Sequence, residues 1–111
     1  MKHFNFGLIA EYLTILFYKL QFYQILGHRV RFYGGEIDII AVRGKQVVFI
    51  EVKARSSDLD DILVRISQQK RITRAAETFL SRNPKYSGHL VRFDLSIVKP
   101  YKLPRIIKNA W

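Results

Sequence analysis

Apolar side chains between residues 7 and 23 recur at every third or fourth position, which is the first clear pattern along the chain. This spacing is typical of an amphipathic helix with a wide buried face. We expect Gly27 to end the helix. Residues 29–33 then alternate briefly between polar and apolar side chains and predict a short edge strand, which the glycine pair Gly34 and Gly35 interrupts.

Two runs rich in Ile and Val follow and predict a β-hairpin. They extend from Glu36 to Val42 and from Gln46 to Val52, and Gly44 between them supplies the backbone freedom of a tight turn. Apolar residues occur on both sides of each run, as in strands that are buried on two faces. A two-residue loop of Gly44 and Lys45 fixes which residues of the two strands lie opposite each other.

This loop length places four charged residues on one face of the hairpin. Asp38 lies opposite Glu51, and Glu36 lies opposite Lys53. Because side chains alternate along a strand, all four project in the same direction. The other face is expected to carry Ile37, Ile39, Ile50 and Val52.

Two carboxylates that face each other across strands repel, because their Cβ atoms lie roughly 4.5–5.5 Å apart. A buried pair is therefore protonated, salt-bridged to a neighbour such as Lys53, or bound to a cation. Mg²⁺ or Mn²⁺, which prefer oxygen ligands, suit such a site. The competing interpretation is a solvated charge cluster at a sheet edge, which explains each residue singly but not their gathering on the most apolar hairpin of the chain.

The second half of the chain predicts one more helix and one more strand. Asp58 or Asp60 can cap a helix that we expect over residues 61–82. Residues 89–98 alternate between apolar and polar side chains and predict a strand with one buried face. The tail around Ile106 is a candidate edge strand.

The predicted order is helix, strand, strand, strand, helix, strand. It is typical of an α/β or α+β fold in which helices flank one central mixed β-sheet. The 111 residues are expected to form a single domain, 1–111, because each half of a two-domain chain would be too small to bury a core.

The charge balance indicates a polyanionic partner. Nineteen Lys and Arg residues against nine Asp and Glu residues give a formal net charge of +10, so nucleic acid or an acidic membrane surface would be attracted. The chain has no cysteine, which excludes disulfides, thiol nucleophiles and thiolate metal sites. The apolar N-terminal stretch contains Glu11 and Lys19 and has no cleavage pattern of a signal peptide, so we expect a cytoplasmic protein without a membrane partner.

The acids and the lysine of the hairpin form a familiar motif. Asp38 followed by Glu51-Val52-Lys53 resembles the PD-(D/E)xK signature of metal-dependent nucleases. The longer context, residues 35–41, 48–55 and 92–94, resembles the YraN family of uncharacterised, endonuclease-like bacterial proteins (family 0102). The resemblance extends over nearly the whole chain.

Positions on both predicted helices also match this family. Glu11 stands where the family has a Glu in its first helix, and Lys70 stands where it has a Lys in its second helix. The chain departs from the pattern at Ala10, where a Gly usually precedes the helix Glu, and at Arg29, where an Asn is usual. Both departures lie outside the motif of acids and lysine.

The resemblance implies a restriction-endonuclease-like core that is similar to archaeal Holliday-junction resolvases. It implies that Asp38 and Glu51 hold Mg²⁺ or Mn²⁺, with the backbone carbonyl of Val52 as a further ligand. Such a metal lowers the pKa of a bound water and polarises the scissile phosphate.

The same resemblance gives roles to the neighbouring charged residues. Lys53 would orient the water or stabilise charge that develops on the phosphorane. Glu11 could reach the metal through water, and Glu36 is either an acid behind the metal ligands or the salt-bridge partner that positions Lys53. The implied catalytic residues are Glu11, Asp38, Glu51 and Lys53.

Basic residues gather around the second predicted helix. Contact with nucleic-acid phosphates is one interpretation, and counterion release would favour it. A merely solvated helix face is the other, since the apolar residues of this helix already account for a core face. Gln68 is a weaker candidate for the rim of the site. The candidate nucleic-acid-binding residues are Arg55, Arg65, Lys70, Arg71 and Arg74.

Two functions therefore compete. The first is a metal-dependent nuclease that hydrolyses phosphodiester bonds of nucleic acid, with DNA favoured over RNA and branched or damaged DNA as a candidate substrate. The second is a non-catalytic nucleic-acid-binding module of a DNA repair or processing complex. A homodimer with two-fold symmetry is a further option, because it would bring two active sites to two strands.

Overall fold

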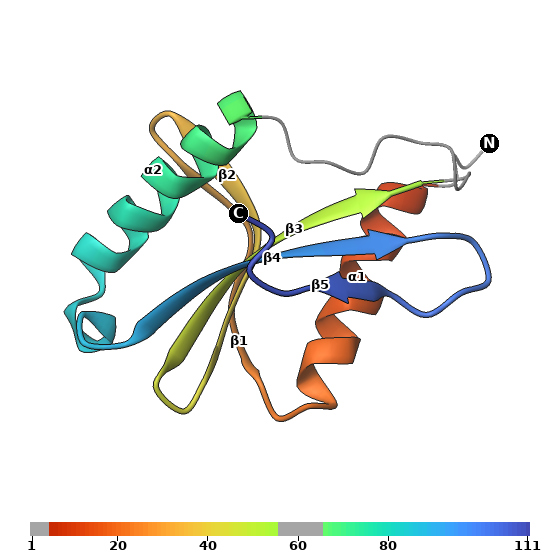
Figure 1. Cartoon of the computed structure of the whole chain (residues 1–111), viewed down its shortest axis with the longest axis horizontal. Helices are drawn as coiled ribbons and strands as arrows, with labels where there is room; N and C mark the ends of the chain where they lie inside the picture. Colours follow the sequence, from red (N-terminus) through yellow and green to blue (C-terminus); the bar gives the residue numbers. More distant parts are fainter. Residues whose placement is uncertain (1–4, 56–65) are drawn as a thin grey trace.

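The computed structural model describes residues 5–55 and 66–111 (Figure 1). The predicted order of helices and strands is confirmed, as is the α+β fold with one mixed sheet. The elements are α1 (Phe6–Lys19), β1 (Gln24–Phe32), β2 (Gly35–Arg43), β3 (Gln46–Ala54), α2 (Ile66–Arg82), the short 3₁₀ helix η1 (Pro84–Tyr86), β4 (Leu90–Val98) and β5 (Arg105–Ile107). The predicted helix caps Asp58 and Asp60, and the first turn expected for the second helix, lie outside the described residues.

The five strands form a single sheet in the order β1-β2-β3-β4-β5. Strands β3 and β4 pair in parallel and the other neighbours pair antiparallel, so the sheet is mixed. The two helices lie on opposite sides of this sheet (Figure 1). The candidate edge strand of the tail is confirmed as β5, which pairs with β4.

The predicted hairpin register is confirmed. Gly44 adopts a φ of +60°, and Arg43 pairs with Gln46 across the two-residue loop. Pairing between β2 and β3 continues as far as Ile39 and Ile50 and then stops, although both strands extend further. The hairpin therefore opens at the positions of the two acids.

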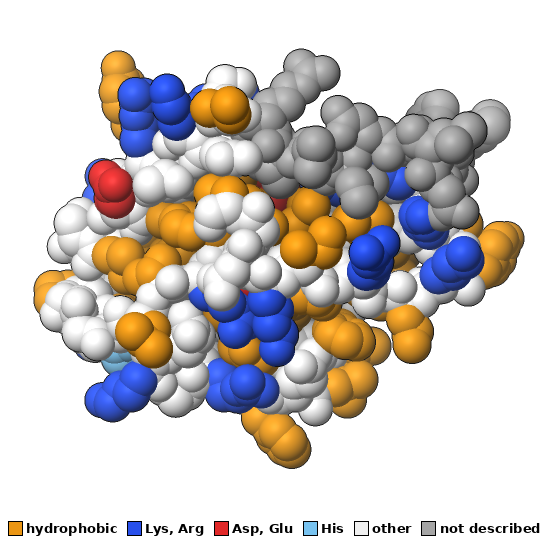
Figure 2. Space-filling model, in the orientation of Figure 1, with side chains coloured by type: hydrophobic (Ala, Val, Ile, Leu, Met, Phe, Trp, Pro, Cys, Tyr) orange, Lys and Arg blue, Asp and Glu red, His pale blue; other side chains and the backbone are white. Residues whose placement is uncertain are grey.

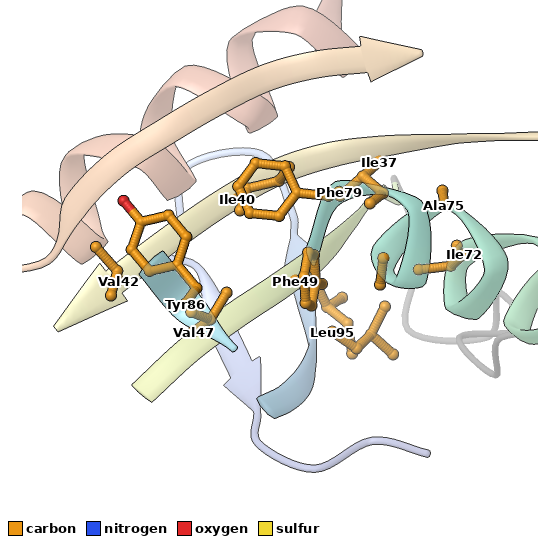
Figure 3. Close-up of a cluster of buried hydrophobic side chains, with 12 residues drawn as sticks. Ile37, Ile40, Val42, Val47, Phe49, Ile72, Ala75, Phe79, Tyr86 and Leu95 are labelled. Atoms are coloured by element: carbon orange, nitrogen blue, oxygen red, sulfur yellow. The ribbon is translucent and has the colours of Figure 1, made fainter. Parts of the chain in front are cut away.

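The sheet separates two apolar clusters. On the α2 side, Phe49 of β3 meets the ring of Phe79 edge-on (Figure 3). Phe49 also stacks on Phe93. On the α1 side, Tyr18 and Tyr23 pack over the strands together with Ile39, Ala41, Val48 and Ile50. Both faces of β2 and β3 are covered, which explains the apolar residues on both sides of the two runs.

One facing prediction is wrong. Ile37 packs in the α2 cluster rather than with Ile39 on the α1 side. The cause lies in the neighbouring strand, where Arg29 has a left-handed φ of +54° that breaks the alternation of side chains. His28 before it contacts α1, whereas Val30 after it packs in the α2 cluster and pairs with Ile37.

The end of the first helix was also predicted wrongly. α1 ends at Lys19, because the chain reverses through Phe22 in a left-handed conformation with a φ of +69°. Gly27 lies inside β1 rather than at the helix end, next to an irregularity in the pairing with β2. A Cβ atom there would lie 2.5 Å from Cγ2 of Val30, so glycine is required by this irregularity.

Strand β4 is buried on both faces, not on one as predicted. Asp94 and Ser96 are completely buried beneath α1. The hydroxyl of Tyr18 donates to Asp94 at 2.7 Å, Arg92 forms two hydrogen bonds to the same carboxylate, and the hydroxyls of Thr14 and Ser96 lie 2.8 Å apart. Polar residues of β4 thus face the core because α1 supplies their partners.

None of the helices in the described part of the chain combines the length and the apolar character that crossing a membrane would require.

We predict that Asp94→Ala lowers the free energy of unfolding by about 3–5 kcal/mol, because the guanidinium of Arg92 and the hydroxyl of Tyr18 lose a buried partner. Urea denaturation followed by circular dichroism measures this loss. The matched control is Arg31→Ala, which breaks the exposed ion pair to Glu36 and should cost less than about 1 kcal/mol. Equal losses in the two variants would contradict the prediction.

Candidate functional site

The acids of the hairpin line a cavity of about 590 Å³ between the opened strands and α2. Asp38 and Glu51 form its floor with Glu36 near its rim, and Gln68 and Arg71 of α2 also line it. These are the acids that the register predicted to share a face. Lys53, the fourth charged residue predicted on this face, does not line the cavity.

Gly35 sets the distance between the helix and the acids. A Cβ atom at this position would lie 2.5 Å from the carbonyl oxygen of Arg71. A glycine is therefore needed for α2 to approach the strand this closely.

Asp38 holds the opened end of the hairpin together. Its Oδ2 accepts a hydrogen bond from the backbone N–H of Val52 at 2.8 Å. In a fully paired hairpin, the residue opposite Val52 would supply the backbone carbonyl that accepts this hydrogen bond. Here the ladder between β2 and β3 ends at Ile39 and Ile50. The carboxylate of Asp38 thus replaces a main-chain acceptor and lies beside the strand that carries Glu51.

Glu51 is buried and poorly suited to carry a negative charge in isolation. Its exposed fraction is 9%. Burial, followed by a hydrogen bond to Asp38 and the charge of that residue, raises the pKa of Glu51 to about 9, while the charge of Lys53 opposes the rise. At neutral pH Glu51 is thus protonated. This proton relieves the repulsion between the two acids, which a bound cation would otherwise relieve.

Gln68 connects the remaining members of the motif. Its Nε2 donates to Oε2 of Glu51 at 3.0 Å, and its Oε1 accepts from Nζ of Lys53 at 3.1 Å. Sequence reasoning gave Gln68 only a weak role at the rim. Helical periodicity could have predicted that Gln68 faces the sheet, because it lies one turn before Ile72, which belongs to the core face of α2.

Glu36 does not contact Lys53. It forms an exposed ion pair with Nε of Arg31 at 3.0 Å. The salt bridge considered as a way of positioning Lys53 is therefore replaced by the contact with Gln68, and Glu36 lies at the rim of the cavity.

Glu11 contacts two residues of β1 rather than the other acids. Its Oε1 lies 2.6 Å from Nε2 of His28 and accepts from Nε of Arg29 at 2.8 Å, while its Oε2 accepts from Nη2 of Arg29 at 3.3 Å. The hydrogen bonds and charge of Glu11 raise the pKa of Arg29, with smaller contributions from Glu36 and Asp38. Within residues 5–55 and 66–111, no group of three or more His, Asp or Glu side chains is placed to hold a metal ion.

Arg29 has a left-handed backbone conformation with a φ of +54°, which Asn tolerates better than most residues. In this chain the position is occupied by an arginine whose guanidinium binds the helix acid with two nitrogens.

Three of the basic residues predicted to bind nucleic acid line two different pockets in the described part of the chain. Arg71 lines the cavity of the acids, whereas Lys70 and Arg74 line a second groove of about 430 Å³ on the other side of α2, next to Trp111. The side chain of Arg55 donates to the carbonyl of Ala54. Arg65 lies outside the described residues. Lys and Arg side chains are spread over the face seen in Figure 2, and few acidic ones reach it.

Comparison with known proteins places the chain in a family. A model of the uncharacterised protein family UPF0102 matches residues 10–98. The UPF0102 protein amb4503 of Paramagnetospirillum magneticum is 40% identical over 111 residues, which cover 95% of this chain and 85% of that protein. A UPF0102 protein of Methylorubrum extorquens is 41% identical over 107 residues, which cover 95% of this chain and 83% of that protein. This chain belongs to the uncharacterised protein family UPF0102.

The UPF0102 match confirms the family resemblance that the hairpin motif indicated. The matched range includes Glu11, the hairpin acids, Lys53 and Lys70. The names of these relatives state a family and no activity.

We predict that Glu51→Gln stabilises the metal-free protein increasingly as the pH rises. In the folded protein Glu51 keeps its proton up to a pH of about 9, whereas in the unfolded chain it loses the proton near 4.5. The folded state thus binds the additional proton between these values, and this contribution to stability is lost as the pH rises through that window. A glutamine does not titrate, so its advantage should reach at least about 1 kcal/mol at pH 8.

Thermal unfolding in EDTA from pH 5 to pH 9 measures this difference. Glu77→Gln removes an exposed carboxylate of α2 and is the matched control. Parallel curves for wild type and Glu51→Gln across this range would contradict the raised pKa.

Proposed function

We propose that this protein is a Mg²⁺- or Mn²⁺-dependent nuclease that hydrolyses phosphodiester bonds of DNA, with branched or damaged DNA as candidate substrates. The observation that carries the proposal is the pair Asp38 and Glu51 at the open end of the hairpin, with Lys53 held beside it by Gln68. The likeness of the motif to PD-(D/E)xK nucleases and junction resolvases is the reason for DNA rather than RNA.

The chemistry of the donors fits a hard divalent cation. Asp38 and Glu51 offer carboxylate oxygens in one cavity, and their mutual repulsion is relieved at present by a proton on Glu51. These two residues would hold the ion, with the backbone carbonyl of Val52 as a further oxygen donor. When bound, such an ion lowers the pKa of a water molecule and polarises the phosphate.

Lys53 supplies the positive charge that the reaction needs beside the acids. Its ammonium group has three donors, of which one is used by Oε1 of Gln68. The others can reach a phosphate oxygen, where they would stabilise negative charge that develops as the bond to phosphorus forms. Gln68 is a positioning residue in this mechanism, because it fixes Lys53 and Glu51 relative to each other.

Arg71 and Arg31 would bind the phosphates next to the scissile bond. Both line the cavity of the acids, and Arg71 is exposed to solvent. Lys70 and Arg74 lie on the other side of α2 and would contact a backbone that continues past the helix. The net charge of +10 supports this reading, because phosphate contacts release counterions.

We predict metal-dependent cleavage of labelled linear, flap and four-way-junction DNAs by the wild type. Asp38→Asn removes a metal ligand and Lys53→Ala removes the charge beside it, so each should lower the cleavage rate by about 10²–10³-fold. EDTA should abolish cleavage. Glu77→Gln is the control for an acid outside the cavity, and Glu11→Gln tests whether the helix acid contributes although it contacts His28 and Arg29.

The outcome also separates the two functions. Tight binding of these DNAs without any cut under either metal would overturn the nuclease and favour a non-catalytic binding module of a repair or processing complex. Circular dichroism of each variant confirms that a lost activity is not a lost fold.

We predict that Arg71→Ala weakens DNA binding and lowers the slope of log K against log salt concentration by about one, because one phosphate contact is lost. Fluorescence anisotropy in EDTA measures binding without cleavage. Lys45→Ala removes an exposed charge from the hairpin loop and is the control, with an unchanged slope expected. The same slope in both variants would place the phosphates elsewhere.

A further inference from the structure

The outward face of α1 is apolar where solvent normally selects polar residues. Five large side chains of this helix and its end have exposed fractions of 36–71%. Lys19 is the one charged residue among the exposed residues of α1, since Glu11 is buried. The five side chains are Ile9, Tyr12, Leu13, Leu16 and Leu20.

The second helix of the same protein provides an internal comparison. The outward face of α2 carries Lys70, Arg71, Arg74 and Glu77, as expected of a helix whose one side faces water. The two helices therefore differ in what their outward faces are suited to contact.

Four of the α1 residues have the spacing of a helix-pairing seam. Ile9, Leu13, Leu16 and Leu20 follow one another at intervals of four, three and four residues. This is the repeat by which one helix packs against another in a coiled coil. The inward face of α1, which contains Ala10, already covers the sheet, so the seam is available to a second helix.

The apolar surface continues beyond the helix. Ile9 and Leu13 line a groove of about 780 Å³ together with Tyr101 and Leu103, which are themselves exposed, and with Lys99 and Lys102. A stable interface buries about 800 Å² on each partner. The exposed Leu, Ile and Tyr side chains of α1 and of this loop are the apolar surface that such an interface would bury.

Charge selects the partner. Two molecules that each carry a net charge of +10 repel, so they would meet along the helix seam, where Lys19 is the one exposed charged residue of α1, rather than over Lys99 and Lys102 of the adjoining groove. An acidic membrane surface would instead favour a helix with Lys and Arg along its exposed side, which α1 lacks. Nucleic acid would require basic residues for the same reason.

We propose that the outward face of α1 is the interface between two copies of this chain, with the two helices antiparallel about a two-fold axis. Ile9 of one copy then packs against the partner's Leu20, and Leu13 against the partner's Leu16. α2 lies on the opposite side of the sheet from α1 (Figure 1). The cavity of the acids is lined by residues of α2 and therefore stays open in such a dimer.

The mass of the full chain in solution tests this interface without DNA or metal, so its outcome is independent of the proposed nuclease. Sedimentation velocity at up to about 100 µM should give twice the chain mass of 13.1 kDa. Leu16→Glu should give the single mass with an unchanged circular dichroism spectrum. Leu90→Glu changes an equally large exposed side chain at the start of β4 and should leave the dimer intact.

Engineered disulfides test the antiparallel arrangement directly, because the chain has no cysteine of its own. Mixed Leu13→Cys and Leu16→Cys chains should form a cross-linked pair on oxidation in higher yield than either variant alone, since the two positions face each other. Leu90→Cys should not cross-link.

Three results would overturn the interface. They are a wild type that stays at 13.1 kDa at the highest concentration, a Leu16→Glu variant that remains dimeric, and a monomeric wild type that floats with phosphatidylserine vesicles. The last result would assign the apolar face to a lipid surface instead.

Discussion

The hydrogen bond between the backbone of Val52 and the carboxylate of Asp38 is the contact on which the candidate site depends. A hairpin that remained paired to its end would use a main-chain carbonyl there and leave no room between the strands. With Asp38 as the acceptor, the strands part without leaving a buried N–H unsatisfied. The acid that keeps the opened strands in place also forms half of the carboxylate pair.

The two sides of the sheet differ in the partners of their buried carboxylates. Below α1, the carboxylate of Asp94 has three partner groups and contributes to a fixed interior, because Arg92, Tyr18 and the backbone N–H of Asn109 all point to it. Below α2, Glu51 accepts a hydrogen bond from the amide of Gln68 and forms another with its acidic neighbour Asp38. One buried acid is thus paired with a guanidinium, whereas the other is paired with a second acid that raises its pKa.

Local patterns were sufficient to predict the hairpin and its register. The loop at Gly44 and the alternation of Ile and Val leave few other arrangements, and the facing acids follow from them. The contacts that were not predicted join residues far apart in the sequence. Asp94 is buried because Tyr18 lies above it, and no residue near Asp94 in the sequence indicates that Tyr18 is its partner.

The same limit applies to the first strand and to the helix residues around the site. The left-handed backbone at Arg29 turns Ile37 to the other side of the sheet. An arginine in the sequence does not indicate such a backbone conformation. Gln68 could have been placed by helical periodicity, but its two partners depend on how far the hairpin opens. Glu11 could be assigned to the first helix, yet its contacts with β1 depend on tertiary packing.

The close approach at Gly35 bears on how relatives of this protein can diverge. The backbone oxygen of Arg71 lies nearest to this glycine, and Cβ of Ala75 lies next to it, so the gap between helix and strand depends on a small residue at position 75 and not on the side chain of Arg71. Exchange of Arg31 or Arg71 would reshape the walls of the cavity while the distance from α2 to the acids stayed the same. The walls of the cavity can therefore vary in charge and shape without a change in the position of its acids.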